Sequence, residues 1–97
     1  MDIKTMQANA LEASGLLKTM SHPDRLLVLC QLTEGEVGVS ELQHNSQLSQ
    51  SAFSQHLAVL KKKQLISSRK SSLQVFYSLS DPRVKTLVQT LHQLFCQ

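Results

Sequence analysis

The spacing of apolar residues changes at about residue 65, and this change limits the folds that are open to the chain. Before the change, apolar residues recur every three or four positions, as at Phe53, Leu57 and Leu60, which is the period of an amphipathic helix. After it, residues 65–70 and 74–79 form two strand-like runs, with Val75, Tyr77 and Leu79 on one face of the second. A chain of 97 residues is long enough for one domain. The sequence therefore predicts a helical domain that carries a single β-hairpin.

Capping signals mark where the predicted helices begin. Pro23 suits the first turn of a helix, where its missing N–H is harmless. Residues 40–43, Ser-Glu-Leu-Gln, match a capping box, so we expect Ser40 to cap the next helix. Ser49 is placed to cap the helix after that. The helices expected in chain order are 3–20, 23–34, 40–47, 50–63 and 81–96.

The middle of the chain has the element order of a winged helix-turn-helix. A short helix, a turn and a longer helix with a polar and basic outer face, at about residues 40–63, are typical of a helix-turn-helix. The hairpin at about residues 65–79 then supplies the wing. Its tip, residues 71–73, contains no glycine, so the turn type stays open. We therefore expect residues 1–97 to form one mainly helical winged-helix domain.

Positive charge is concentrated in the middle of the chain. Between Leu42 and Ser80 there is no Asp or Glu, but there are five Lys and Arg residues, in a chain whose net charge is +3. A basic surface framed by mildly acidic ends suits a polyanion such as double-stranded DNA. A solvated lysine-rich face is the alternative, although the lack of acids over so long a stretch favours the nucleic-acid partner.

The outer face of the predicted helix 50–63 holds the candidates for DNA contact. Glutamine can pair with adenine and serine can donate or accept at base edges, whereas lysine and arginine contact phosphates. His56 lies at the edge of the apolar face and is either a DNA contact or a packing residue. An ordinary solvent face is the alternative for the whole set. The candidate base readers are Gln50, Ser51, Ser54 and Gln55, and the candidate phosphate contacts are Lys61, Lys62, Arg69 and Lys70.

A single winged helix contacts only a few base pairs, so we expect the chain to act as a pair. Pairing through helices 3–20 and 81–96 would place two recognition helices about one turn of DNA apart. The apolar stripe of helix 81–96 is wide for the surface of so small a domain, so it is either central to the core or covered by a second copy. We therefore predict a homodimer on an inverted-repeat operator.

The two cysteines, Cys30 and Cys96, are the candidates for redox chemistry. A thiol in a helix commonly serves as a small buried apolar group, which is one interpretation of Cys30. Cys96 is the penultimate residue, and His92, one turn before it, can favour a thiolate. If the two helices pack together, a reversible bridge can link the helix that leads into the DNA reader with the dimerisation helix. The alternative is a constitutive DNA-binding protein with structural cysteines.

Other chemistry has little support in the sequence. No two histidines are four residues apart, and no Cys-x-Cys or Cys-x-x-Cys occurs, so we expect no metal site and no cofactor. There is no phosphate-binding glycine loop and no nucleophile elbow, so we expect no enzyme. No apolar run is long enough to span a bilayer and no secretory signal is visible, so we expect no membrane partner and a cytoplasmic location.

Three segments of the chain resemble bacterial repressors of the ArsR family. They are Ser-Gln-Ser-Ala-Phe-Ser-Gln-His-Leu at 49–57, Ser-Glu-Leu at 40–42 and Leu-Lys-Thr-Met-Ser-His-Pro-Asp-Arg-Leu at 17–26. Together with the strand at 75–79, they are distributed from residue 17 to residue 79. The resemblance implies a dimeric winged-helix repressor whose first and last helices form the interface.

Within that family, the chain is similar to the subgroup of HlyU, SqrR, BigR and YgaV. The subgroup has one thiol in the second helix and another in a C-terminal Leu-His/Lys-x-x-Tyr/Phe-Cys ending, here Cys30 and Cys96. The resemblance implies that reactive sulfur species or an oxidant joins the two thiols through a disulfide or polysulfide bridge, and that DNA is then released. The cysteine box of arsenical sensors and the last-helix ligand set of zinc sensors are absent, which implies that the effector is not a metal.

Overall fold

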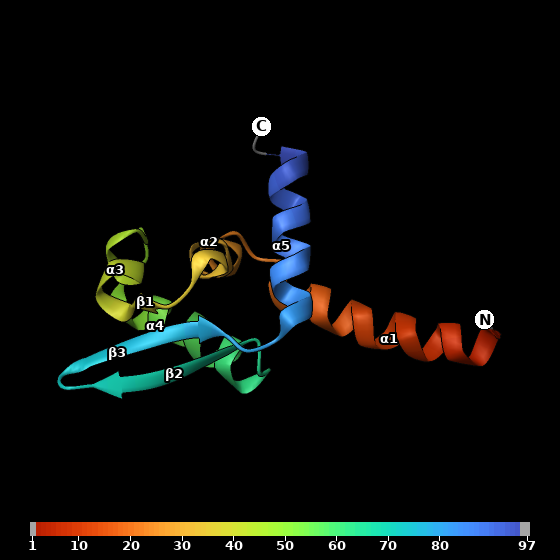
Figure 1. The fold of residues 1–97 in the computed structure, drawn as a ribbon, viewed down its shortest axis with the longest axis horizontal. Helices are drawn as coiled ribbons and strands as arrows, with labels where there is room; N and C mark the ends of the chain where they lie inside the picture. The colour runs from red at the N-terminus through yellow and green to blue at the C-terminus, as the bar shows by residue number, and fades with distance from the viewer. Residues whose placement is uncertain (1, 96–97) are drawn as a thin grey trace.

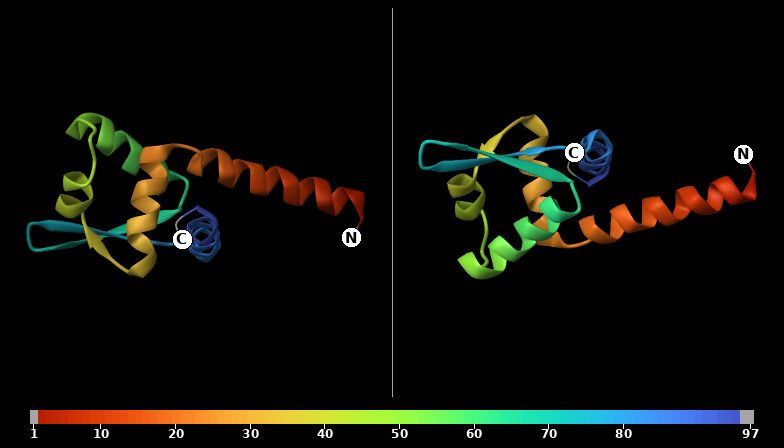
Figure 2. Two further views of the ribbon diagram at one scale, coloured as in Figure 1. Left: turned by 90° about the horizontal axis from the view of Figure 1, so that it is seen from above. Right: turned by 90° about the horizontal axis from the view of Figure 1, so that it is seen from below.

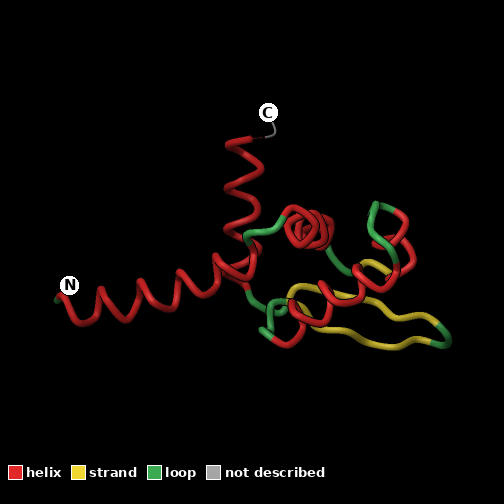
Figure 3. Tube along the Cα trace, turned by 180° about the vertical axis from the view of Figure 1, so that it is seen from behind, coloured by secondary structure: helices red, strands yellow, loops and turns green. Residues whose placement is uncertain are grey.

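Over residues 2–95, which the computed structural model describes, the chain folds into five α-helices, one short 3₁₀ helix and a three-stranded sheet (Figures 1 and 3). This is the mainly helical body with a hairpin wing that the apolar pattern predicts. The elements are α1 (Ile3–Met20), α2 (Pro23–Gln31), η1 (Leu32–Glu34), β1 (Val37–Gly38), α3 (Val39–His44), α4 (Gln50–Lys62), β2 (Ile66–Ser71), β3 (Gln74–Leu79) and α5 (Pro82–Phe95).

The expected helices are confirmed, with differences at their ends. The second one divides into α2 and η1, and Gly35 ends it with a φ of 132°, a backbone angle that side-chain-bearing residues rarely adopt. Ser49 caps α4 as expected, because its side-chain oxygen accepts a hydrogen bond from the backbone N–H of Ala52 at 3.2 Å. The expected end of the last helix, residue 96, lies outside the described residues.

The capping box expected at Ser40 is wrong. α3 begins one residue earlier, at Val39, and its N-cap is Gly38, which makes no side-chain hydrogen bond. The physical reason is a strand that the sequence did not reveal. Gly38, in β1, pairs with Phe76 of β3. The sheet therefore already supplies the extended backbone that an N-cap requires. A strand of two residues is too short to show any alternation of apolar residues.

The sheet has the order β1-β3-β2, and all its pairs are antiparallel. Ser71 lies opposite Gln74, so the hairpin closes through a two-residue tip of Ser72 and Leu73. Ser72 has a φ of 56°, which provides the positive φ that two-residue hairpins use, although the residue is not glycine. The turn that the sequence left open is therefore a tight one.

The hydrophobic core lies where α2, α3, α4 and α5 meet the base of the sheet. The three residues on which the helical period of α4 was recognised, Phe53, Leu57 and Leu60, are all buried, which confirms their expected place. The other buried apolar residues are Met20, Val28, Leu29, Leu32, Leu42, Leu65, Ile66, Val84 and Val88. These contacts fix α4 and the wing on one rigid body.

α1 extends away from this body, in the direction opposite to the wing (Figures 1 and 2). Only Thr19 and Met20, at its C-terminal end, are buried. Arg83 at the start of α5 links the two helices, because its guanidinium donates to Glu12 of α1 and also to Asp81, both at 2.8 Å. Over residues 2–95, no helix combines the length and the apolar character needed to cross a membrane.

Candidate DNA interface and thiol site

The outer face of α4 carries the expected base readers in exposed positions. The apolar side of the helix is held in the core, so the opposite side must face solvent. The residues exposed on α4 include Gln50, Ser51, Ser54, Gln55, Lys61 and Lys62. Short polar side chains on a firmly anchored helix are suited to hydrogen bonding at base edges in the major groove.

Lys61 connects this face to the wing. Its ammonium group donates a hydrogen bond to the hydroxyl of Ser68 in β2, at 2.8 Å. Lys70, farther along the same strand, is exposed close to the tip of the hairpin. The two elements expected to contact DNA are therefore joined by a side-chain hydrogen bond as well as by the core.

Arg69 is held in an ion pair, an environment that its position in the sequence did not indicate. Its Nε and Nη2 donate to the two carboxylate oxygens of Glu36, at 2.6 and 2.7 Å, and its guanidinium lies 4.9 Å from the centre of the Phe76 ring. These hydrogen bonds hold the pKa of Glu36 below its usual value. Glu36 precedes the stretch without acids in the sequence, and its carboxylate neutralises part of the positive charge of that stretch.

His56 is half-buried and faces the corner between α1 and α2 rather than open solvent. Its Nδ1 accepts a hydrogen bond from Arg25 Nε at 3.1 Å, and its ring lies 4.3 Å from that of His22. Arg25 also donates through Nη1 to the carbonyl of Thr19, at 3.1 Å. His22 is itself the N-cap of α2, because its Nδ1 accepts from the backbone N–H of Asp24. These contacts support the packing role that the sequence left as an alternative.

The same corner brings together one possible ligand set among the described residues. His22, Asp24 and His56 each place a donor atom within 4.8 Å of the others, a proximity that sequence spacing does not reveal, because His56 is distant in the chain. The Nδ1 atoms of both histidines already accept hydrogen bonds, one from Arg25 and one from the N-terminus of α2. A cation there would also meet the Arg25 guanidinium and the positive end of a helix. The cluster is therefore organised for hydrogen bonding.

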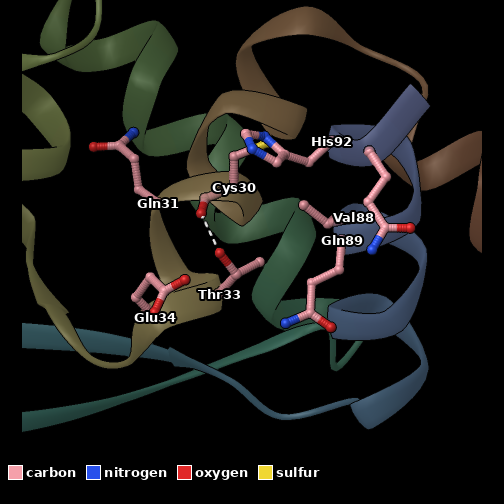
Figure 4. A pocket seen from close by; sticks show the side chains of 8 residues that line it. Cys30, Gln31, Thr33, Glu34, Val88, Gln89 and His92 are labelled. Atoms are coloured by element: carbon pink, nitrogen blue, oxygen red, sulfur yellow. Dashed lines mark hydrogen bonds between the residues drawn. The ribbon is translucent and has the colours of Figure 1, made fainter. Parts of the chain in front are cut away.

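Cys30 lies exposed on α2, at the side that packs against α5. It lines a cavity of about 620 Å³ between these helices, in which the side chain of His92 extends from α5 toward α2 (Figure 4). Thr33 closes the turn beside it by donating to the carbonyl oxygen of Cys30 at 2.7 Å. The interpretation of Cys30 as a buried core group is therefore wrong. Its neighbours Val28 and Leu29 are buried in the core, whereas Cys30 is exposed.

A second, smaller cavity reaches Cys30 from the end of α5. It has a volume of about 260 Å³, and its lining consists of Leu26, Cys30, Val88, Leu91, His92 and Phe95. Cys96, the other expected thiol, lies outside the described residues. It follows Phe95 directly in the sequence.

Sequence reasoning missed the residues that hold the candidate interface in place. Arg25 joins three helices, and Glu36 pairs with the wing, yet each is remote in sequence from its main partner. A helical or alternating pattern reports which face a residue occupies. It does not report which residue of another element lies opposite, so these two roles had no signal in the sequence.

Comparison with known proteins places the chain among bacterial regulators. Residues 22–68 match the family described as bacterial regulatory protein, arsR family. The chain is 44% identical over 97 residues to the transcriptional activator HlyU of Vibrio cholerae, a match that covers all of this chain and 90% of the relative. It is 40% identical over 91 residues to the biofilm growth-associated repressor of Xylella fastidiosa, with 94% and 80% covered.

A solved structure extends this likeness to the fold. Reduced HlyU from Vibrio cholerae N16961 superposes with a TM-score of 0.92 at 44% identity, over 98% of this chain and 100% of that one. The agreement covers the helical body and the hairpin together. The winged-helix fold expected from the sequence is confirmed.

Proposed function

The chain belongs to the arsR family of bacterial regulatory proteins and is a DNA-binding transcriptional regulator, and on this premise we propose that oxidation of Cys30 and Cys96 releases it from its operator. The observation that carries the proposal is the position of Cys30. This thiol is exposed in a cavity that Phe95, the neighbour of Cys96, also lines. A bridge between α2 and the end of α5 would constrain the helix that leads into the DNA-binding unit.

The redox step uses an effector of the persulfide or peroxide class. Two thiols lose two protons and two electrons as the S–S bond forms. A persulfide that accepts the electrons is reduced to a thiol and hydrogen sulfide, whereas a peroxide is reduced to water. His92 lines both cavities beside Cys30 and can favour the thiolate that attacks. One of the similar solved structures is that of HlyU from Vibrio cholerae in its reduced form.

DNA recognition is assigned to the outer face of α4 and to the wing. The exposed polar residues Gln50, Ser51, Ser54 and Gln55 are proposed to read base edges in the major groove. The proposed phosphate contacts are Lys61, Lys62, Arg69 and Lys70, all of them exposed. His56, held by Arg25, is proposed to support the position of α4.

We also infer that the functional unit is a homodimer in the cytoplasm, on an inverted-repeat operator. Along α1 an apolar face including Ile3, Met6 and Leu17 is exposed. A helix in a protein gains most of its stability from the packing of its apolar face, so α1 needs a surface to cover that face. A second copy supplies one by symmetry, through its own α1 and the exposed Leu94 and Phe95 of α5.

The thiol proposal is tested with the substitutions Cys30→Ser and Cys96→Ser. Either variant should bind a duplex from its own promoter as tightly as the wild type but should keep that affinity after persulfide treatment. The treated wild type should lose about 5- to 150-fold, the usual range of allosteric coupling. Gel shift measures binding, and intact mass identifies the bridge. If both serine variants lose affinity as the wild type does, the protein is a regulator with structural cysteines.

A further inference from the structure

We propose that His56 acts as an acid-sensitive latch. As a neutral imidazole it holds the recognition helix α4 against the corner of α1 and α2. On protonation it releases α4, and operator binding weakens. The effect on operator binding rests on the proposed role of α4 in reading DNA. The latch itself rests on contacts within the folded chain.

The first step is the hydrogen bond between Arg25 and His56. Arg25 Nε–H donates to Nδ1 of His56 at 3.1 Å, and a guanidinium has donors but no acceptor. This bond therefore exists only while Nδ1 carries no proton. Because Arg25 also donates to the carbonyl of Thr19, the loss of this bond detaches α4 from both α1 and α2 at this point.

The second step is the electrostatic environment of the ring. Burial lowers the pKa of His56, and the nearby His22 and Arg25 lower it further, whereas Asp24 raises it. A proton on His56 would place a positive charge beside the Arg25 guanidinium and 4.3 Å from the ring centre of His22. One carboxylate, Asp24, opposes two groups that repel the charge, so the neutral form is favoured in the folded chain.

His22 holds the other side of the same corner. Its Nδ1 accepts the backbone N–H of Asp24 at 3.1 Å and so caps α2. Its ring lies against that of His56, with 4.3 Å between the ring centres.

The sign of the pH effect follows from the direction of the shift. A histidine whose pKa is lowered by folding binds its proton more weakly in the folded than in the unfolded chain. The stabilisation is complete above the ordinary histidine pKa of about 6.5. It is lost as the pH falls from there through the lowered value, so stability and operator affinity should both decline on mild acidification.

The test replaces His56 by asparagine. In His56→Asn, the side-chain oxygen stands on the same Cγ as Nδ1 and can accept from Arg25, but it does not titrate. His44→Asn is the matched control, because His44 is exposed on α3, outside the cluster. The dissociation constant for a labelled duplex from the upstream region of its own gene is measured at pH 7.5 and 5.5, in reductant and at constant ionic strength.

The wild type and H44N should weaken on acidification by at least about threefold more than H56N, because they keep the acceptor nitrogen that a proton removes. Equal changes in wild type and H56N, or a larger loss in H56N, would overturn the latch. Unfolding against pH, without DNA, gives a second measure, in which H56N should lose less stability. If the wild type fails to bind DNA at pH 7.5 while this difference in unfolding persists, the DNA proposal fails and the internal latch stands.

Discussion

The charge that a residue presents to a partner depends on what folds against it. Arg69 lies in a stretch without acids, yet its guanidinium donates two hydrogen bonds to Glu36. Lys70, the next residue in the chain, is exposed near the hairpin tip. Neighbouring cations in one strand therefore differ in how readily they can turn to a phosphate.

Removing the acid should release this arginine to DNA. We predict that Glu36→Gln tightens binding to double-stranded DNA about fivefold at low salt, as expected for unit charges about 4 Å apart in water. It should also steepen the dependence of log affinity on log salt by about one, the signature of one added phosphate contact. Fluorescence anisotropy across a salt series measures both quantities.

Glu34→Gln provides the control, because it makes the same change in net charge at an exposed residue of η1. Its effect should be smaller, and its salt slope should match that of the wild type. If both variants behaved alike, the pairing of Glu36 with Arg69 would have no bearing on DNA binding.

At the scale of the element, the first residues of α3 and α4 show when the local sequence is sufficient to predict where a helix begins. The cap of α4 was predicted correctly because Ser49 acts on the N–H of Ala52, within its own first turn. The cap of α3 was predicted wrongly because the strand pairing of Gly38 set its first residue. A local motif is decisive only where no tertiary contact competes for the same backbone.

The two serines offer a direct comparison of these cases. Ser49→Ala should lower the free energy of unfolding by about 1 kcal/mol, since it leaves an N–H of α4 without its acceptor. Ser40→Ala should change it by less than about 0.5 kcal/mol, because Ser40 is an exposed residue inside α3 and not its cap. Urea denaturation measures both, and equal losses would contradict the assignment of the caps.

At the scale of the whole molecule, α1 is the part that the fold leaves uncovered. It projects from the body opposite to the wing (Figure 2). Arg83 of α5 donates a hydrogen bond to Glu12 of α1 and so links the two helices. The molecule measures 50 × 31 × 23 Å, so one chain is elongated. An exposed apolar helix at one end and a candidate DNA face at the other suit an assembly in which α1 pairs.

A charge on the apolar face of α1 should therefore separate the copies. Leu17, 52% exposed, lies on that face, whereas Leu11, 76% exposed, lies about 120° away from Leu17 around the helix. We predict that Leu17→Glu gives a monomer at micromolar concentration by light scattering and weakens operator binding more than tenfold, because half of the phosphate contacts are lost. Leu11→Glu should stay dimeric. A dimeric L17E, or a monomeric wild type, would contradict the homodimer.

The sequence by itself determined the order of the five α-helices and the hairpin, the helix ends with local caps, the buried stripe of α4 and the polar face opposite to it. These features depend on the period of apolar residues and on hydrogen bonds within a single turn, so neighbours in the chain suffice to define them. Tertiary structure alone decided which elements meet. It brought Glu36 to Arg69, Arg25 to His56, and Cys30 to the inner side of α5. Such pairs are formed when the core closes, and their geometry depends on packing between elements that no local pattern encodes.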